Sequence, residues 1–263
     1  MEQKCKTNKG YALVTGASSG IGYAYAQALA TRGYPLIIVS NEEAIHDKGA
    51  ELRGLFPHLD IVARQQDLGL PKAARELYEW TKARGMEVEV LINNAGVYHD
   101  RDFLQDSEGF TELILNLHVV TPAMLCYYYG QDMQQRHRGY ILNMSSVTSN
   151  YGAQRMSTYA STKGFLRLFT RSLHIELRQQ GVHVTCIRPG AVATPLYHLN
   201  ARAMKAGLAM GAIIRPEQLA EKGLRALFRG KHETTPGLFT KLLALVPLLP
   251  TWLLRLIRRW GWF

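Results

Sequence analysis

Short apolar runs recur along the chain, and stretches with apolar residues at helical spacing separate them. Six runs have the composition of strands, at residues 11–16, 35–40, 60–67, 88–96, 140–146 and 182–190. Most are apolar at consecutive positions, which is typical of strands covered on both faces. Helical patterns lie between and after them, at residues 21–33, 42–56, 72–85, 109–139, 161–181 and 215–231.

The regular alternation of strand and helix predicts an α/β fold with a doubly wound parallel sheet and helices on both faces. Residues 1–235 contain no linker, composition shift or internal repeat, so we expect them to form one domain. Residues 236–263 are then an apolar, basic, helical C-terminal tail. Because ligands of such folds bind beyond the carboxyl ends of the strands, candidate functional residues should directly follow the strands.

The net charge of +10 is compatible with nucleic acid, an anionic membrane or an anionic ligand. No basic run is interleaved with aromatic residues, which argues against nucleic acid. The three cysteines are far apart and predict neither a metal site nor a disulfide framework: Cys5, Cys126 and Cys186. The first ten residues lack the apolar stretch of a secretory signal, so we expect a cytoplasmic location.

A glycine-rich stretch, "TGASSGIG" at residues 15–22, joins the first strand to the first helix. Gly16, Gly20 and Gly22 permit a tight turn and a close approach of the backbone to a pyrophosphate, which the free N–H groups of the helix terminus then bind. A loop that serves only packing is the alternative. The position between strand and helix at the start of the domain favours a dinucleotide cofactor.

The stretch "TYASTKGF" places Tyr159 and Lys163 one helical turn apart. A phenol has an ordinary pKa of about 10, which is too high for proton exchange near neutral pH. A neighbouring cation favours the phenolate and lowers that pKa, so the pair is a candidate acid–base catalyst. Alternatively the two side chains are a solvated pair on a surface helix.

Taken in order, several motifs resemble the short-chain dehydrogenase/reductase family. After "TGASSGIG" come "NNAG" at 93–96, Asn116 in "LNLHVV", Ser146 in "NMSS", "YASTK" with Tyr159 and Lys163, and "RPGAVATP" at 188–195. The resemblance runs from residue 11 to about residue 231, and Ser146 precedes Tyr159 by thirteen positions, as in the family. It implies a Rossmann-type fold and an NAD(P)-dependent oxidoreductase.

The resemblance also implies catalytic roles. Tyr159 would give the proton to the carbonyl oxygen, and Lys163 would lower its pKa and bind the nicotinamide ribose. Ser146 would donate a hydrogen bond to the substrate oxygen, and Asn116 would support a proton relay to Lys163. Three other residues are interpreted as structural: His118, Cys126 and His174.

A set of cofactor-binding residues follows from the same resemblance: Gly16, Ser18, Ser19, Gly20, Ile21, Gly22, Ser40, Asn41, Asp67, Asn93, Ala95, Gly96, Tyr159, Lys163, Pro189, Gly190, Val192 and Thr194. NAD is usually recognised by an acid about 20 residues beyond the glycines. Here that position holds Ser40 and then Asn41, which favours NADP. Glu42 and Glu43 follow closely, so NAD stays open. No metal is expected.

The segment 196–214 is apolar and rich in methionine, which suits a bulky apolar ligand: Leu196, Tyr197, Met204, Leu208 and Met210. An amphipathic helix on the core is the alternative.

The tail combines leucines and tryptophans with arginines and is interrupted by Pro247 and Pro250, which favours an interfacial helix over a spanning one. Closure over an apolar substrate site is one alternative for the tail, and packing across the domain or a neighbouring subunit is another.

Relatives with similar tails include reductases of 3-oxoacyl or 3-ketosphingoid lipids. We therefore expect an NADP(H)-dependent oxidoreductase that reduces a carbonyl of an apolar or lipid-like small molecule to an alcohol. An NAD-linked hydroxysteroid or other secondary-alcohol dehydrogenase is one alternative, and a non-catalytic dinucleotide-binding regulator is another. Peripheral membrane contact through the tail and assembly into a homo-oligomer are further expectations to test.

Overall fold

The computed structural model describes residues 9–98, 100–151, 155–194 and 201–245. Seven parallel strands form one sheet in the order β3-β2-β1-β4-β5-β6-β9. Their bounds are β1 Tyr11–Thr15, β2 Leu36–Ser40, β3 Ile61–Gln65, β4 Val88–Asn93, β5 Gly139–Met144, β6 Val182–Ile187 and β9 Glu233–Thr234. A second, two-stranded sheet pairs β7 (Ala191–Val192) with β8 (Ile213–Ile214). The predicted parallel, doubly wound sheet is confirmed.

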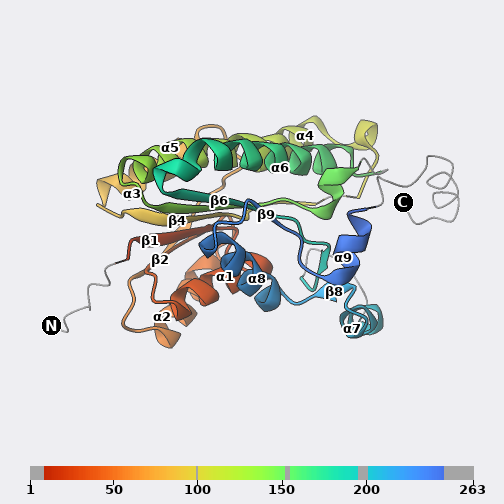
Figure 1. Cartoon of the computed structure of the whole chain (residues 1–263), viewed down its shortest axis with the longest axis horizontal. Coiled ribbons are helices and arrows are strands. Elements are labelled where there is room, and N and C mark those ends of the chain that lie inside the picture. Colours follow the sequence, from red (N-terminus) through yellow and green to blue (C-terminus); the bar gives the residue numbers. More distant parts are fainter. Residues whose placement is uncertain (1–8, 99, 152–154, 195–200, 246–263) are drawn as a thin grey trace, which may run out of the picture.

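Helices cover both faces of the large sheet. One layer contains α3 (Ala73–Ala83), α4 (Glu108–Leu115), α5 (Thr121–Gln135) and α6 (Ser157–Leu177), and the other contains α1 (Gly20–Thr31), α2 (Ile45–Leu55) and α8 (Pro216–Phe228) (Figure 1). Two short helices, α7 (Ala201–Ala209) and α9 (Leu238–Leu243), lie with β8 at one end of the molecule. The chain thus has the three-layer arrangement that continuous apolar strands require.

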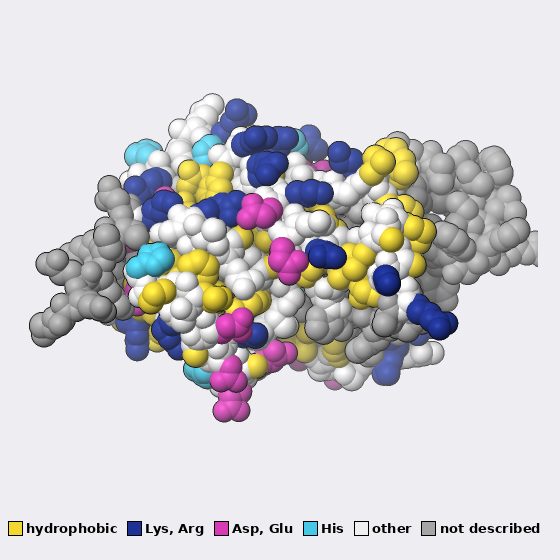
Figure 2. Space-filling model, turned by 90° about the horizontal axis from the view of Figure 1, so that it is seen from below, with side chains coloured by type: hydrophobic (Ala, Val, Ile, Leu, Met, Phe, Trp, Pro, Cys, Tyr) yellow, Lys and Arg dark blue, Asp and Glu magenta, His cyan; other side chains and the backbone are white. Residues whose placement is uncertain are grey.

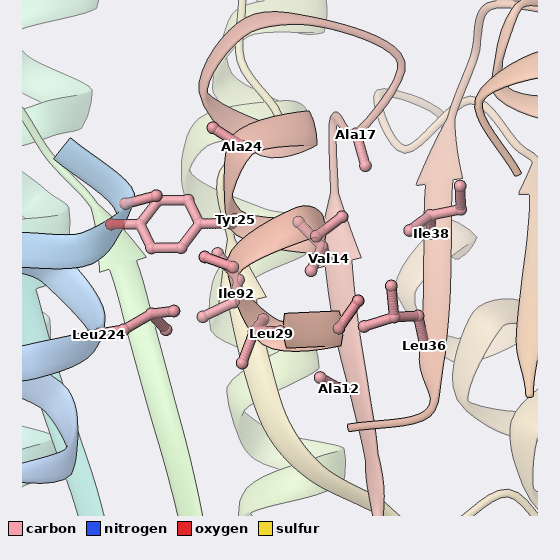
Figure 3. Close-up of a cluster of buried hydrophobic side chains, with 14 of the residues drawn as sticks. Ala12, Val14, Ala17, Ala24, Tyr25, Leu29, Leu36, Ile38, Ile92 and Leu224 are labelled. Atoms are coloured by element: carbon pink, nitrogen blue, oxygen red, sulfur yellow. The ribbon is translucent and has the colours of Figure 1, made fainter. Parts of the chain in front are cut away.

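Each helix layer buries its apolar stripe against the sheet. Tyr25 and Leu29 of α1 and Leu224 of α8 are fully buried together with Val14 of β1 (Figure 3). On the opposite face, α3, α5 and α6 cover a second cluster around Leu91 and Ile141. Burial of a side chain of this size contributes about 1.5–3 kcal/mol, so these two clusters hold the layers in register.

The helix predicted over residues 109–139 is interrupted. It consists of α4, one π-helical turn at Asn116–Val120 and α5, which ends at Gln135. Among the described residues, the run Glu108–Gln135 is long and apolar enough to cross a membrane. Its C-terminal half, however, packs on β4 and β5, with Leu125, Tyr129 and Met133 in the core. We therefore interpret it as a core helix.

Two strand predictions needed correction. The third strand is shorter than residues 60–67, so that Asp67 lies beyond its end. The last strand, β9, was not predicted, because the strand has only two residues and both Glu233 and Thr234 are polar. They extend the sheet by pairing with Cys186 and Ile187 at the edge.

The strand order reverses between β1 and β4, since β2 and β3 lie on one side of β1 while β4, β5 and β6 follow on the other. Chain segments leaving β1 and β4 diverge there and leave a crevice at the carboxyl edge of the sheet. The predicted motifs follow β1, β4, β5 and β6 and therefore meet at this edge.

Candidate active site

A cleft of about 540 Å³ opens at the carboxyl edge of the sheet. Most of the predicted site residues line it: Gly16, Ser18, Ser19, Gly20, Ile21, Gly22, Ser40, Asn41, Asp67, Ala95, Gly96, Ser146, Tyr159, Lys163, Pro189, Gly190, Val192 and Thr194. They come from seven different segments of the sequence. The fold thus brings the glycine turn and the Tyr159–Lys163 pair into one cavity, which we call the main cleft.

The glycine turn is tightly packed against the loop after β4. A Cβ on Gly22 would lie 2.0 Å from the carbonyl oxygen of Gly16, and a Cβ on Gly16 would lie 2.8 Å from Ala95 Cα. The Asn94 side chain donates to the carbonyl oxygens of Thr15 and Gly16, at 2.9 and 3.2 Å. Only glycine permits this approach, and the turn leaves the helix N-terminus of α1 facing the cleft.

Asn93 and Asn116 are absent from the described lining of the main cleft. Asn93 is buried behind it, where its amide donates to Asn143 Oδ1 at 2.8 Å. The neighbouring Asn94 lines the cleft instead, because successive side chains at a strand end point to opposite faces. Asn116 begins the π-turn, and it is His118, two residues further, that reaches the cleft.

His118 connects three segments of the site. Its Nε2 accepts a hydrogen bond from the Val97 N–H at 2.9 Å, so the proton of the neutral ring lies on Nδ1, which is 3.1 Å from Thr162 Oγ1. The Thr162 hydroxyl donates to the carbonyl oxygen of Tyr159 at 2.8 Å. Burial, and next the charge of Lys163, lower the pKa of His118 well below its usual value, so the ring stays neutral.

The position of His118 also explains why a glycine ends the "NNAG" motif, since Gly96 has no room for a side chain. A Cβ at Gly96 would lie 2.8 Å from His118 Nε2. The interpretation of His118 as a structural residue agrees with its two protein partners, although no pattern in the sequence indicates that it lies in the cleft. A π-turn, which is frequent at functional sites, brings it there.

Tyr159 and Lys163 lie on one face of α6, as their spacing predicts. The Tyr159 ring lies edge-on to the rings of Tyr98 and His118, at centroid distances of 5.2 and 5.8 Å. Lys163 Nζ lies 5.6 Å from the centroid of the Tyr159 ring and donates to the carbonyl oxygen of Met144 at 3.0 Å. Lys163 is therefore held by the end of β5 and leaves two N–H groups for other partners.

Burial lowers the pKa of the Lys163 ammonium from 10.5 to about 8. The side chain is only 4% exposed, and desolvation penalises its charged form. At neutral pH it still carries its charge. A buried cation so close to a phenol favours the phenolate form of that phenol, which is the chemistry expected of the pair.

Ser146 follows β5 and is buried at the cleft wall. Its hydroxyl oxygen accepts hydrogen bonds from the Thr148 N–H at 3.2 Å and the Thr148 hydroxyl at 2.9 Å. The neighbouring Ser145 hydroxyl donates to the carbonyl oxygen of Lys163 at 2.7 Å. The two serines therefore have different tasks: Ser145 ties β5 to α6, and the Ser146 proton remains to donate into the cleft.

At the other end of the main cleft, Ser40 ends β2. Its hydroxyl donates to Ser18 Oγ at 3.0 Å and accepts from the Glu42 N–H at 3.2 Å. Asn41 and Glu42 line the cleft beside it, whereas Glu43 is not part of the described lining. Ser40, Asn41 and Glu42 thus surround the place where the second ribose of a dinucleotide would lie.

The described residues fit a dinucleotide. The Thr194 hydroxyl is buried, lines the cleft and has no hydrogen-bond partner among the described residues. A buried polar group of this kind is rare without a partner and is suited to a bound polar group. Together with the glycine cradle and the two unused N–H groups of Lys163, it gives the cleft polar contacts along its length.

The segment 196–214, which the sequence suggests for an apolar ligand, is described only in part. Leu196 and Tyr197 lie outside the described residues. Leu208 and Met210 line a separate groove beside α7 and α9 rather than the main cleft. Four further residues line the main cleft and are not among the predicted ones: Val97, Tyr98, Leu113 and Leu117. Of these, Tyr98 lies beside Tyr159, whereas Leu113 lies beside Gly69 and Asp67.

Comparisons with known proteins agree with this geometry. A family model described as short chain dehydrogenase matches residues 10–205. The short-chain reductase protein NovJ of Streptomyces niveus is 33% identical over 193 residues, which are 70% of each chain. Very-long-chain 3-oxoacyl-CoA reductase-A of Danio rerio is 29% identical over 195 residues, 71% of this chain and 59% of that relative, so the chain spans well under two thirds of the relative's length.

Two solved structures share the fold. The bulky-bulky ketone specific alcohol dehydrogenase from Comamonas testosteroni has a TM-score of 0.76 and 27% identity, covering 88% of this chain and 87% of that one. A short-chain dehydrogenase from Sphingobium yanoikuyae in complex with NADPH has a TM-score of 0.77 and 26% identity, covering 88% and 89%. The chain belongs to the short-chain dehydrogenase family.

Proposed function

We propose that the protein is an NADP(H)-dependent reductase that converts a carbonyl of an apolar or lipid-like small molecule to an alcohol. The observation that carries this proposal is the meeting of Ser146, Tyr159 and Lys163 in the cleft that also holds the glycine turn. A binding protein has no need of a buried lysine next to a tyrosine, because the burial of a charge is costly. A reductase does need a proton donor beside the cofactor.

In the proposed reaction the bound nicotinamide supplies the hydride, and the chain supplies orientation and a proton. The Ser146 hydroxyl donates a hydrogen bond to the substrate oxygen. The Tyr159 phenol gives that oxygen its proton, and the Lys163 ammonium stabilises the phenolate that remains. Because Lys163 is held by the Met144 carbonyl, its charge stays in place through the transfer.

The apolar nature of the substrate is inferred from the catalytic end of the main cleft. The Tyr98 ring lies beside Tyr159 there, with 5.2 Å between the ring centroids, and the described lining of the main cleft offers no cation other than Lys163 for a substrate carboxylate. The names of relatives agree with a bulky or long-chain ketone, since they include very-long-chain 3-oxoacyl-CoA reductases and a bulky-bulky ketone specific alcohol dehydrogenase.

NADP is proposed as the cofactor because Ser40 stands where an acid would repel a 2′-phosphate. The Asn41 amide can donate hydrogen bonds to that phosphate, and so can the Ser40 hydroxyl once it turns away from Ser18 Oγ. NADPH is bound in the Sphingobium yanoikuyae neighbour. Glu42 opposes this choice and favours the NAD-linked alternative, because its carboxylate lines the same end of the cleft. Titration of both cofactors by fluorescence tests the proposal, and NADPH should bind more tightly than NADH. Ser40→Asp should reverse this preference, and Glu42→Gln should increase the preference for NADPH.

The reaction itself is tested with a panel of ketones that includes long-chain 3-oxo lipids, bulky ketones and small polar ketones. We expect NADPH oxidation with the apolar members. Tyr159→Phe should lose on the order of 10²-fold or more of the turnover, because the phenol supplies the proton. It should still bind cofactor, because the ring contacts remain. Turnover near that of the parent in Tyr159→Phe would refute the mechanism, and a preference for polar ketones would refute the substrate class.

The division at residue 235 is also part of the proposal. The first turn of the tail already packs on the domain, since a Cβ at Gly190 would lie 2.6 Å from Thr240 Oγ1. The Asn150 side chain donates to the carbonyl oxygen of Ala244 at 2.9 Å. Residues 246–263 lie outside the described residues. We therefore propose that the tail begins as a packed helix, α9, before its apolar and basic remainder.

A further inference from the structure

Beside the main cleft, α7, β8 and the start of α8 form a second depression with α9, of about 820 Å³. We call it the α7–α9 groove. Its lining is largely apolar and includes Leu208, Met210, Ile213, Leu238, Phe239 and Leu242. The groove takes no part in the catalytic chemistry described above.

Much of this apolar lining faces solvent. The exposed fractions are 77% for Leu238, 74% for Met210 and 59% for Leu242, which are far above those of a buried lid. Leu245, one turn after Leu242, is 54% exposed. Figure 2 shows hydrophobic side chains gathered with lysines and arginines at the end of the molecule that carries α7 and α9. An apolar patch of this kind is a sign of an interaction surface.

The charges around the groove have one sign. Lys205, Arg215 and Lys222 belong to its lining, and no aspartate or glutamate does among the described residues. Lys241 is exposed beside it on α9. The nearest acids along the sequence are Glu217 and Glu221, and Glu221 pairs with Arg32. None of the four cations forms an ion pair with another described residue.

We propose that the α7–α9 groove is the surface by which the protein docks on an anionic lipid bilayer. A bilayer offers apolar acyl chains for the leucines, phenylalanine and methionine, and negative headgroups for the cations at the rim. A second copy of the chain fits less well, because an isologous contact would bring like charges together. Nucleic acid would leave the apolar side chains without partners.

The chain that continues from α9 supports this occupant. Residues 246–263 contain further leucines, three tryptophans, and Arg255, Arg258 and Arg259 without an acid. They follow directly on the exposed side chains of Leu242 and Leu245. The described groove and the remaining sequence therefore share one chemistry, which is that of a membrane interface.

Docking through this groove would also place the main cleft next to the bilayer. Val192 of the cleft lining pairs with Ile214 of the groove lining in the small β7–β8 sheet. Among the described residues, this two-stranded sheet contributes to both sites. If the proposed function is right, an apolar ketone could pass from the bilayer to Tyr159 with little exposure to water. The docking itself does not depend on turnover.

Co-sedimentation of the full chain with vesicles tests the proposal, using phosphatidylcholine alone and phosphatidylcholine with phosphatidylserine. The parent should bind the anionic vesicles more tightly, and added salt should weaken this preference. Lys205→Gln with Lys222→Gln should lower binding to the anionic vesicles on the order of 25-fold, at about fivefold for each basic residue. Leu238→Ser with Leu242→Ser should lower binding to both kinds of vesicle.

A matched control changes the same charge elsewhere. Arg229→Gln with Lys231→Gln alters two exposed cations at the far end of α8 and should bind like the parent. Thermal unfolding checks that every variant is folded. The proposal is overturned if the parent does not sediment, if the groove variants bind like the parent, or if the control loses as much binding as Lys205→Gln with Lys222→Gln. Since binding is measured without substrate, these outcomes leave the proposed reductase activity to its own test.

Discussion

At the scale of single residues, the charge of Lys163 opposes folding although the proposed reaction needs it. Its pKa falls from 10.5 in the unfolded chain to about 8 in the fold, because burial disfavours the ammonium. Between these two values the unfolded chain binds a proton that the folded chain has released. The free energy of unfolding therefore rises with pH across this window. Below the window the buried charge lowers the free energy of unfolding by its full amount.

Lys163→Met should accordingly be more stable than the parent at neutral pH, by at most on the order of 3 kcal/mol. The lost hydrogen bond to Met144 reduces this gain. The difference should shrink as pH rises from about 8 to about 10.5. Urea unfolding across this range measures it. If the variant is less stable than the parent at neutral pH, the expectation is wrong. We also expect the variant to lose turnover and to bind the cofactor more weakly.

We expect His118 to be a positioning residue. It contacts Thr162, which donates to the Tyr159 carbonyl oxygen, and it accepts the Val97 N–H after the "NNAG" motif. His118→Gln can still accept the Val97 N–H, whereas His118→Phe leaves it unsatisfied at a cost of about 1–3 kcal/mol. We expect the glutamine variant to keep several times more of the kcat than the phenylalanine variant. Because the ring is neutral, neither change should move the pH profile.

Steady-state kinetics and thermal unfolding, compared in the two His118 variants, separate this role from simple packing. A residue that only fills space would be replaced well by phenylalanine and poorly by glutamine. If His118→Phe keeps the kcat of the parent, the positioning role is wrong. A pH profile that shifts in both variants would show that the ring titrates, against the lowered pKa of His118.

At the scale of elements, the turn between β1 and α1 depends on the absence of side chains. A Cβ at Gly22 would meet the Gly16 carbonyl at 2.0 Å, a distance that backbone atoms cannot accommodate. Gly22→Ala should therefore shift the helix N-terminus, weaken cofactor binding at least tenfold and lower the free energy of unfolding by about 1–3 kcal/mol.

Gly54 near the end of α2 provides the matched control, because no atom lies within 4 Å of a Cβ built there. Gly54→Ala should be neutral or should stabilise the protein by up to about 1 kcal/mol, since alanine is the better helix former. Cofactor titration and urea unfolding measure both effects. Equal cofactor affinity in the two variants would contradict the importance of the turn.

At the scale of the whole molecule, α6 leaves an apolar stripe uncovered. Leu168 and Ile175, seven residues apart and so on one face, are each 69% exposed, and Phe165 is 37% exposed. Such a stripe on a helix that covers the sheet is suited to contact with a second copy of the chain. This contact is distinct from the α7–α9 groove, whose cations disfavour self-association.

We therefore expect light scattering to give a mass at least twice the 29.6 kDa of one chain. Leu168→Lys with Ile175→Lys should lower it to that of one chain, because two cations would be buried without partners. Leu55→Lys, which alters an apolar side chain with 56% exposure at the end of α2, should not change the mass. A monomeric parent protein would refute this expectation.

The sequence by itself determined the order of strands and helices, the glycine turn and the Tyr159–Lys163 pair. These features are local: apolar periodicity reports which segments are buried, and a spacing of four on a helix places two side chains on one face. The confirmed doubly wound sheet follows from the same patterns, because continuous apolar strands can be buried only between two layers of helices.

Only the tertiary structure decided which of two neighbouring residues reaches the cleft. Asn94 rather than Asn93 lines it, because the alternation of the last strand residues turns one amide toward Gly16 and the other toward Asn143. His118 rather than Asn116 lines it, because a π-turn alters the helical phase there. The short edge strand β9 forms only because β6 is already in place to pair with it. Each outcome depends on contacts between segments far apart in the sequence, which no local pattern encodes.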